Sequence, residues 1–158
     1  MARAILICGM ICSGKSTLAK AIASKENAII LSNDELTKVL GDDLGERHDA
    51  VAARTQGYLR QKAIELVRLG INVILEWGFW RATDRAAISR YLTEAGVPFE
   101  WHFMDVSPEQ LRRNVERRNA NPLPSDYRVD EGLLNKCLSA FEPPSPDEMD
   151  VIHTSAIC

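Results

Sequence analysis

The chain has 158 residues and a formal net charge of −3, with 46% hydrophobic and 26% charged residues. This length suits one hydrophobic core, so we expect a single domain over residues 1–158. The composition is that of a soluble globular protein, and no apolar run approaches the ~20 residues that cross a bilayer. The acidic balance gives no overall attraction to nucleic acid or to an anionic membrane, although a local basic patch would still allow nucleic-acid binding.

The four cysteines have neither the spacing of a metal site nor the density of a disulfide scaffold. They are Cys8, Cys12, Cys137 and Cys158. We therefore expect free thiols and a reducing, cytoplasmic setting. The first residues carry one positive charge, and their apolar run soon ends at Gly9. That pattern is typical of a first β-strand and not of a signal peptide.

Apolar runs alternate along the chain with segments of helical periodicity. The predicted strands are 3–8, 28–32, 71–75, 97–105 and 151–153. The predicted helices are 15–24, a short stretch after Asp34, 47–69, 82–95, 108–118 and 130–140. Ser107 and Pro108 form a strong start signal for the helix that runs to about Arg118. Buried strands that alternate with helices indicate an α/β fold, with a parallel sheet covered on both faces.

Residues 9–16 read GMICSGKS and match the pattern G-x-x-x-x-G-K-[ST] in full. Glycines let such a loop turn tightly and bring backbone N–H groups against phosphate oxygens, and the helix that follows adds unsatisfied donors. We expect Lys15 to reach the β- and γ-phosphates and Ser16 to bind Mg²⁺. The predicted nucleotide-binding residues here are Gly9, Cys12, Ser13, Gly14, Lys15, Ser16 and Thr17.

Two carboxylates follow predicted strands and would lie at the carboxyl edge of the sheet, where open α/β sheets bind ligands. Glu76 is the candidate to hold the metal through a water, and the alternative is a solvated strand end. Asp34 is the candidate base for an attacking hydroxyl. Its alternative role is a helix N-cap, unless Ser32 or Asn33 takes that position.

Arg113 and Arg117 lie four residues apart, so they share one helix face. They precede a segment without periodicity, 119–127, and we expect a short lid over about 118–129. Arginines that enter from a lid can neutralise charge on a transferred phosphoryl group and help to exclude water. Ordinary surface ion pairs are the alternative.

Several other side chains are assigned plainer roles. Arg112 and Arg118 are expected in surface pairs with Glu109 or Glu116, and Arg81 and Arg85 on a helix surface. The aromatic residues after the third strand, Trp77, Phe79 and Trp80, fit an acceptor site and a core equally well. The three histidines, His48, His102 and His153, are predicted to be isolated and without metal-like partners.

Taken together, these features resemble the P-loop kinases that include polynucleotide 5′-kinase, chloramphenicol phosphotransferase, zeta toxin and gluconate or shikimate kinases. The sequence is most similar to small bacterial kinases of an AAA-like, ATP-binding type. The resemblance rests on the P-loop, on Asp34, and on the segments 73–80, 113–121 and 141–144. Two positions depart from it: Glu76 stands where similar proteins often have Asp, and Thr37 and Lys38 stand where polynucleotide kinases tend to have an arginine.

The resemblance implies a three-layer P-loop fold with a five-stranded parallel sheet in the order 2-3-1-4-5. It also implies a base at Asp34, adenine stacking by Arg113 and phosphate contact by Arg117. We therefore expect an enzyme that uses ATP and Mg²⁺ to phosphorylate a hydroxyl of a small molecule, away from membranes. The alternatives are a polynucleotide 5′-hydroxyl kinase and a nucleotide-dependent regulatory ATPase that acts through a partner.

Overall fold

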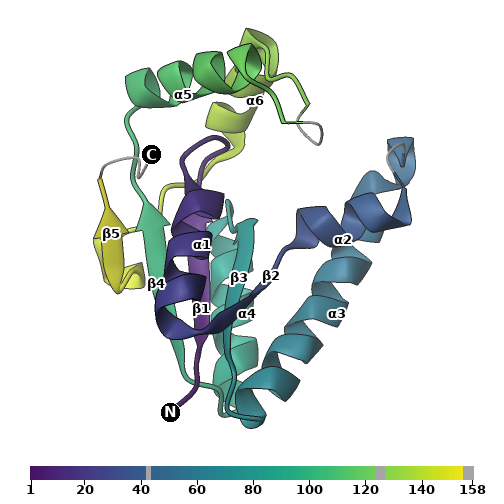
Figure 1. Cartoon of the computed structure of the whole chain (residues 1–158), viewed down its shortest axis with the longest axis vertical. Helices are drawn as coiled ribbons and strands as arrows, with labels where there is room; N and C mark the ends of the chain where they lie inside the picture. The colour runs from purple at the N-terminus through teal and green to yellow at the C-terminus, as the bar shows by residue number, and fades with distance from the viewer. Residues whose placement is uncertain (42–43, 124–126, 155–158) are drawn as a thin grey trace.

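Five parallel strands form one sheet in the order β2-β3-β1-β4-β5, as Figure 1 shows. The structure is a computed structural model, and it describes residues 1–41, 44–123 and 127–154. The strands are β1 Ala4–Gly9, β2 Ala28–Leu31, β3 Asn72–Gly78, β4 Phe99–Met104 and β5 Val151–His153. This is the α/β, P-loop type of fold with the sheet order that was expected, so both predictions are confirmed.

The helices connect successive strands and cover the sheet. They are α1 Lys15–Glu26, α2 Asn33–Leu40, α3 His48–Arg68, α4 Ala82–Glu94, α5 Pro108–Ala120 and α6 Glu131–Ala140, with short 3₁₀ turns η1 Gly45–Arg47 and η2 Pro146–Glu148. Each predicted helix and strand is found, with bounds that differ by a few residues. The described part of the chain holds no helix long and apolar enough to cross a membrane.

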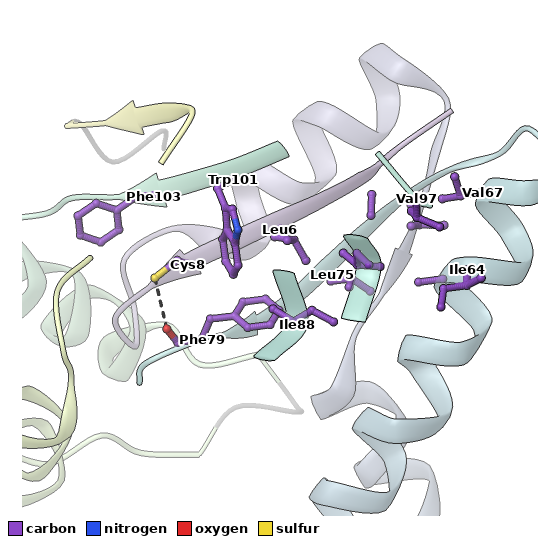
Figure 2. Close-up of a cluster of buried hydrophobic side chains, with 14 residues drawn as sticks. Leu6, Cys8, Ile64, Val67, Leu75, Phe79, Ile88, Val97, Trp101 and Phe103 are labelled. Carbon is purple, nitrogen blue, oxygen red and sulfur yellow. Dashed lines mark hydrogen bonds between the residues drawn. The ribbon is translucent and has the colours of Figure 1, made fainter. Parts of the chain in front are cut away.

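Successive side chains of β1 point to opposite faces of the sheet, so they pack into two different core clusters. Leu6 and Cys8 pack with α3 and α4 on one face, and Figure 2 shows this cluster. Ile5 and Ile7 pack on the other face against α1. Because all of β1 is buried, both faces of the central strand need apolar side chains. The same alternation along β3 places Ile74 on the α1 face, and Glu76, two residues later, reaches Ser16 at the start of α1.

Two predicted bounds were too short, and both matter for the site. β3 continues through Glu76 to Gly78, with a shift in its pairing to β1 between Leu6 and Cys8. Such irregularities re-aim a strand and often lie near functional sites. α5 continues to Ala120, because the N–H of Asn121 still donates to carbonyls of the last turn. The predicted lid, about 118–129, thus begins inside α5, and its residues 124–126 lie outside the described part.

Candidate active site

The P-loop joins the end of β1 to the start of α1 and is packed without spare room. A Cβ at Gly9 would lie 2.8 Å from Ser13 Oγ, closer than real Cβ atoms approach, and 3.1 Å from Met104 Cβ, which is tighter than most Cβ contacts. Gly14 has a φ of 95°, which disfavours a side chain there. Both glycines of the motif are therefore required by the backbone of the loop.

Lys15 is the first residue of α1, and its side chain reaches back to the other end of the P-loop. Its Nζ donates to the Met10 carbonyl oxygen over 2.7 Å. Burial lowers the pKa of Lys15, and negative charge on Glu76 and on Asp34 opposes that shift. The position suits an ammonium that meets phosphate oxygens inside the loop.

Ser16 and Glu76 come together from α1 and β3. The Ser16 hydroxyl donates to Glu76 Oε1 over 2.8 Å. Burial raises the pKa of Glu76, while the Ser16 hydrogen bond and the Lys15 charge lower it. One hydroxyl and one carboxylate suit Mg²⁺, which keeps several waters and takes phosphate oxygens. Among the described residues no cluster of three or more His, Cys, Asp or Glu could hold a metal by itself.

Asp34 lies in the first turn of α2 and is exposed. Ser32 caps this helix, since its Oγ accepts from the Glu35 N–H over 3.3 Å. The alternative role of Asp34 as the N-cap is therefore wrong, and its carboxylate is available for other contacts. Its charge acts on both Lys15 and Glu76, which places Asp34 within electrostatic reach of the P-loop.

Buried polar side chains anchor the start of α2. Asn33 is buried and accepts a hydrogen bond from the Thr55 hydroxyl of α3, over 2.5 Å. Buried polar groups are costly unless paired, so this bond fixes the two helices against each other. Asp34, the next residue, thereby gains a defined position although it is itself exposed.

The arginines of α5 are arranged differently from what was expected. Arg113 and Arg117 are exposed, and Arg117 Nη2 donates to Asn114 Oδ1 over 2.9 Å. Arg118 was predicted in a surface pair, which is wrong. Its Nη1 contacts Cys12 Sγ at 3.3 Å, and its guanidinium lies 5.0 Å from the ring centroid of Tyr127. No periodic pattern in the sequence marks this contact, because it depends on how α5 crosses the loop.

Arg112 does form a surface pair, although with Glu131 of α6 at 3.7 Å and not with an acid of its own helix. The cysteines Cys8, Cys12 and Cys137 are free thiols, as predicted, and Cys158 lies outside the described residues. Burial raises the pKa of Cys8 to about 11, so that thiol is inert at neutral pH.

The aromatic residues that follow Glu76 belong to the scaffold. Phe79 is buried at a φ of 49° and packs edge-on against Trp101, with 5.0 Å between centroids (Figure 2). Its carbonyl meets Cys8 Sγ at 3.5 Å. Trp80 Nε1 donates to the Gly9 carbonyl over 3.1 Å, directly behind the P-loop. The core interpretation is thus the right one for these side chains, and Trp77 packs against the same core.

Arg85 was expected on a helix surface, which is wrong, since it is only 3% exposed. Its Nη1 donates to the carbonyls of Phe79, Trp80 and Glu142, and its Nε pairs with Glu148 at 3.0 Å. The hydrogen bond from Arg85 lowers the pKa of Glu148. A signal was present, because Arg85 lies three and seven residues before the buried Ile88 and Leu92 on one helix stripe.

Two of the three histidines are paired, so the prediction that all are isolated is wrong. His102 Nδ1 lies 3.0 Å from His153 Nε2, and His102 Nε2 lies 2.6 Å from Glu100 Oε1. The pair joins β4 to β5 and is remote in sequence, which is why spacing did not reveal it. His48 lies exposed beside Asp49 at 3.3 Å.

The family model of an AAA domain, AAA_33, matches residues 5–144. The chain belongs to this family. It is a P-loop family of ATP-binding, kinase-type domains, so the resemblance seen in the sequence is confirmed. No curated protein matches the sequence.

Solved structures share the fold. An APS kinase from Mycobacterium tuberculosis, in complex with AMPPNP and APS, is 25% identical with a TM-score of 0.70, over 97% of this chain and 88% of that one. A sugar kinase from Janibacter sp. HTCC2649 is 18% identical with a TM-score of 0.67, over 98% and 86%. A gluconokinase from Sinorhizobium meliloti 1021 is 17% identical with a TM-score of 0.67, over 96% and 82%.

Proposed function

We propose that this protein is an ATP-dependent kinase that transfers the γ-phosphoryl group to a hydroxyl of a small molecule, through a single domain over residues 1–158. The observation that carries the proposal is the Ser16–Glu76 hydrogen bond beside the Lys15 ammonium, with Asp34 acting on both charged groups. Membership of the AAA_33 family supports the part of the proposal that concerns ATP binding. The cysteines in the described part of the chain are free thiols, which fits a reducing, cytoplasmic setting.

In the proposed reaction Asp34 accepts the proton of the acceptor hydroxyl. The acceptor oxygen then attacks the γ-phosphorus, and the bond from that phosphorus to the bridging oxygen breaks, so that ADP leaves. Lys15 and the N–H groups of the P-loop hold the phosphates and stabilise the transferring charge. Preorganised donors do most of this work, because the reaction needs little covalent help from the protein.

Ser16 is proposed to hold Mg²⁺ directly and Glu76 to hold it through water. The metal would neutralise charge on the β- and γ-phosphates. Arg117 is proposed to contact phosphate and Arg113 to stack on adenine, at the base of a lid over about 118–129. The position of Arg117 and Arg113 on one face of α5 supports these roles.

A small-molecule acceptor is supported by two observations. The net charge of −3 gives no general attraction to a polynucleotide. The similar structures named above are kinases of small molecules, although at these identities they fix no substrate for this chain.

The test is an acceptor screen with γ-labelled ATP and Mg²⁺. It covers sugars, nucleosides, adenylylsulfate, aminoglycosides, chloramphenicol-like drugs and 5′-hydroxyl oligonucleotides. We expect label on one class of small molecule, and a loss of at least roughly 100-fold in Lys15→Ala. Label on oligonucleotides would favour the polynucleotide kinase, whereas tight ATP binding without transfer to any acceptor would favour the regulatory ATPase.

A further inference from the structure

Two side chains of α5 meet the P-loop at one residue, Cys12, about one hundred positions earlier in the chain. Asn114 Nδ2 donates to the Cys12 carbonyl oxygen over 2.9 Å. Arg118, one helical turn later, places Nη1 at 3.3 Å from Cys12 Sγ. Figure 1 shows α5 crossing beyond the loop that joins β1 to α1. α5 is therefore attached to the phosphate-binding loop by side chains of one helix face.

The backbone at Cys12 is one that needs support. Its φ is 57°, a left-handed conformation that residues other than glycine rarely adopt. Such conformations persist where surrounding contacts hold them, and they gather at binding sites. The hydrogen bond to the Cys12 carbonyl is a contact of this kind, since it fixes the direction of that peptide group.

The other end of the Asn114 amide holds Arg117. Asn114 Oδ1 accepts from Arg117 Nη2 over 2.9 Å and from Gln110 Nε2 over 2.9 Å. The two ends of the amide cannot be exchanged, because a carbonyl needs a donor and a guanidinium needs an acceptor. One side chain therefore links the backbone of the P-loop to the arginine proposed to contact phosphate.

We propose that Asn114 is a positioning residue for phosphoryl transfer, which holds Arg117 in a fixed relation to the P-loop. This inference rests on the proposed function, in which Arg117 acts on the transferred group. An arginine that is already oriented loses less conformational freedom when it meets a phosphate, and misplacement of such a group is costly to the rate. Both ends of the Asn114 amide are bonded to protein partners, so its effect on transfer passes through Arg117.

The test is a double-mutant cycle with Asn114→Ala and Arg117→Ala in the full chain. The rate of γ-phosphoryl transfer from ATP, to water or to the acceptor found in the screen, is measured together with MgATP affinity and thermal unfolding. We expect Arg117→Ala to slow transfer by about 100-fold and Asn114→Ala by about tenfold, with MgATP affinity changed less than threefold by Asn114→Ala. The double variant should be no slower than Arg117→Ala alone, because Asn114 acts through that arginine.

The matched control is Gln110→Ala, which removes another partner of the same amide on the same helix but leaves the link to the P-loop. It should change the rate by less than about twofold. If the effects of the two substitutions multiply instead, or if Gln110→Ala slows transfer as much as Asn114→Ala, Asn114 is only structural and the inference is wrong. If Asn114→Ala unfolds early, Asn114→Asp serves in the same cycle, because it keeps the acceptor for Arg117 and loses the donor to Cys12.

Failure of the proposed function would look different. In that case the unchanged protein would bind MgATP and transfer label to no small-molecule acceptor of the screen. Transfer to such an acceptor that Lys15→Ala abolishes, together with a multiplicative Asn114–Arg117 cycle, would keep the kinase and remove only the positioning role.

Discussion

The two sides of the candidate site are built in different ways. On the nucleotide side, Gly9, Lys15 and Ser16 are held by backbone packing, and the hydrogen bonds to Met10 and Glu76 close the loop. On the proposed acceptor side, α2 and the first half of α3 project beyond the sheet in Figure 1. Asp34 is exposed there, and Val39 and Tyr58 are 82% and 54% exposed. The nucleotide side is thus made by the fold, and the proposed acceptor side by surface side chains.

This difference explains why the phosphate donor can be read from the chain and the acceptor cannot. A loop that must bring N–H groups against phosphate needs glycines at fixed spacing, so its sequence is constrained. Exposed residues on helices have no such constraint, and acceptor pockets are built from them. Four substitutions, at Asp34, Arg85, Gly9 and Glu76, test this separation.

Asp34→Asn should separate the two sides most clearly. It removes the proposed base without a change of shape, so phosphoryl transfer should fall by roughly 10²–10⁴-fold. MgATP affinity should stay within a few fold, because the P-loop is intact. Transfer rates and calorimetric binding measure the two effects. Near-normal transfer by a variant that still binds ATP would show that another group is the base.

Arg85→Met tests the scaffold behind the nucleotide side. It removes a buried guanidinium that three carbonyls and Glu148 share, and we expect a loss of about 3–5 kcal/mol in the free energy of unfolding. The matched control is Arg81→Met at an exposed position, which should change stability by less than about 0.5 kcal/mol. Denaturant unfolding distinguishes them, and equal losses would contradict a structural role for Arg85.

Gly9→Ala tests whether backbone packing makes the P-loop. The added Cβ would collide with Ser13 Oγ and Met104 Cβ, so we expect nucleotide binding to weaken by about 1–3 kcal/mol. Gly57→Ala is the control, since its Cβ would meet nothing within 4 Å in the exposed middle of α3. That change should stabilise the protein by roughly 0.5–1 kcal/mol and leave nucleotide affinity unchanged. A Gly9→Ala variant with normal affinity would contradict the packing argument.

Glu76→Gln should give the smallest change in stability. Burial raises the pKa of Glu76 above its usual 4.5, so the folded state favours the protonated carboxyl. The stability that this group contributes is therefore present below about pH 4.5 and is lost as the pH rises through the raised pKa. Glu76→Gln should accordingly raise the melting temperature slightly at pH 7 to 8 and have no effect at pH 4.

The same variant should lower the response of ATP binding to Mg²⁺, because an amide is a weaker ligand for this metal than a carboxylate. Melting curves at two pH values and a Mg²⁺ titration with ATP measure both effects. An unchanged Mg²⁺ response would remove Glu76 from the proposed metal site. A lower melting temperature at pH 7 would contradict the argument that burial disfavours the charged carboxylate.

Local patterns of residues are enough to predict the architecture and the phosphate loop. Apolar runs at a period of two, helical stripes and the motif at 9–16 are local patterns, and each depends on residues close together in the chain. The cap at Ser107 is local too, and the structure has it. For the same reason Glu76 could be proposed from its place directly after the apolar run 71–75, although its hydrogen bond to Ser16 was not predicted.

Only the tertiary structure decided which distant side chains meet. Three contacts join residues that are far apart in the chain or belong to different strands and turns. They are the contact of Arg118 with Cys12, the buried hydrogen bonds of Arg85 and the His102–His153 pair. Such contacts depend on how helices cross the sheet, and residue type alone says little about it. An arginine reads as a surface residue because burying its charge is costly, unless acceptors from several segments converge on it. The stripe with Ile88 and Leu92 marks Arg85 as facing the core, but the acceptors that pair with its guanidinium converge only in the folded molecule.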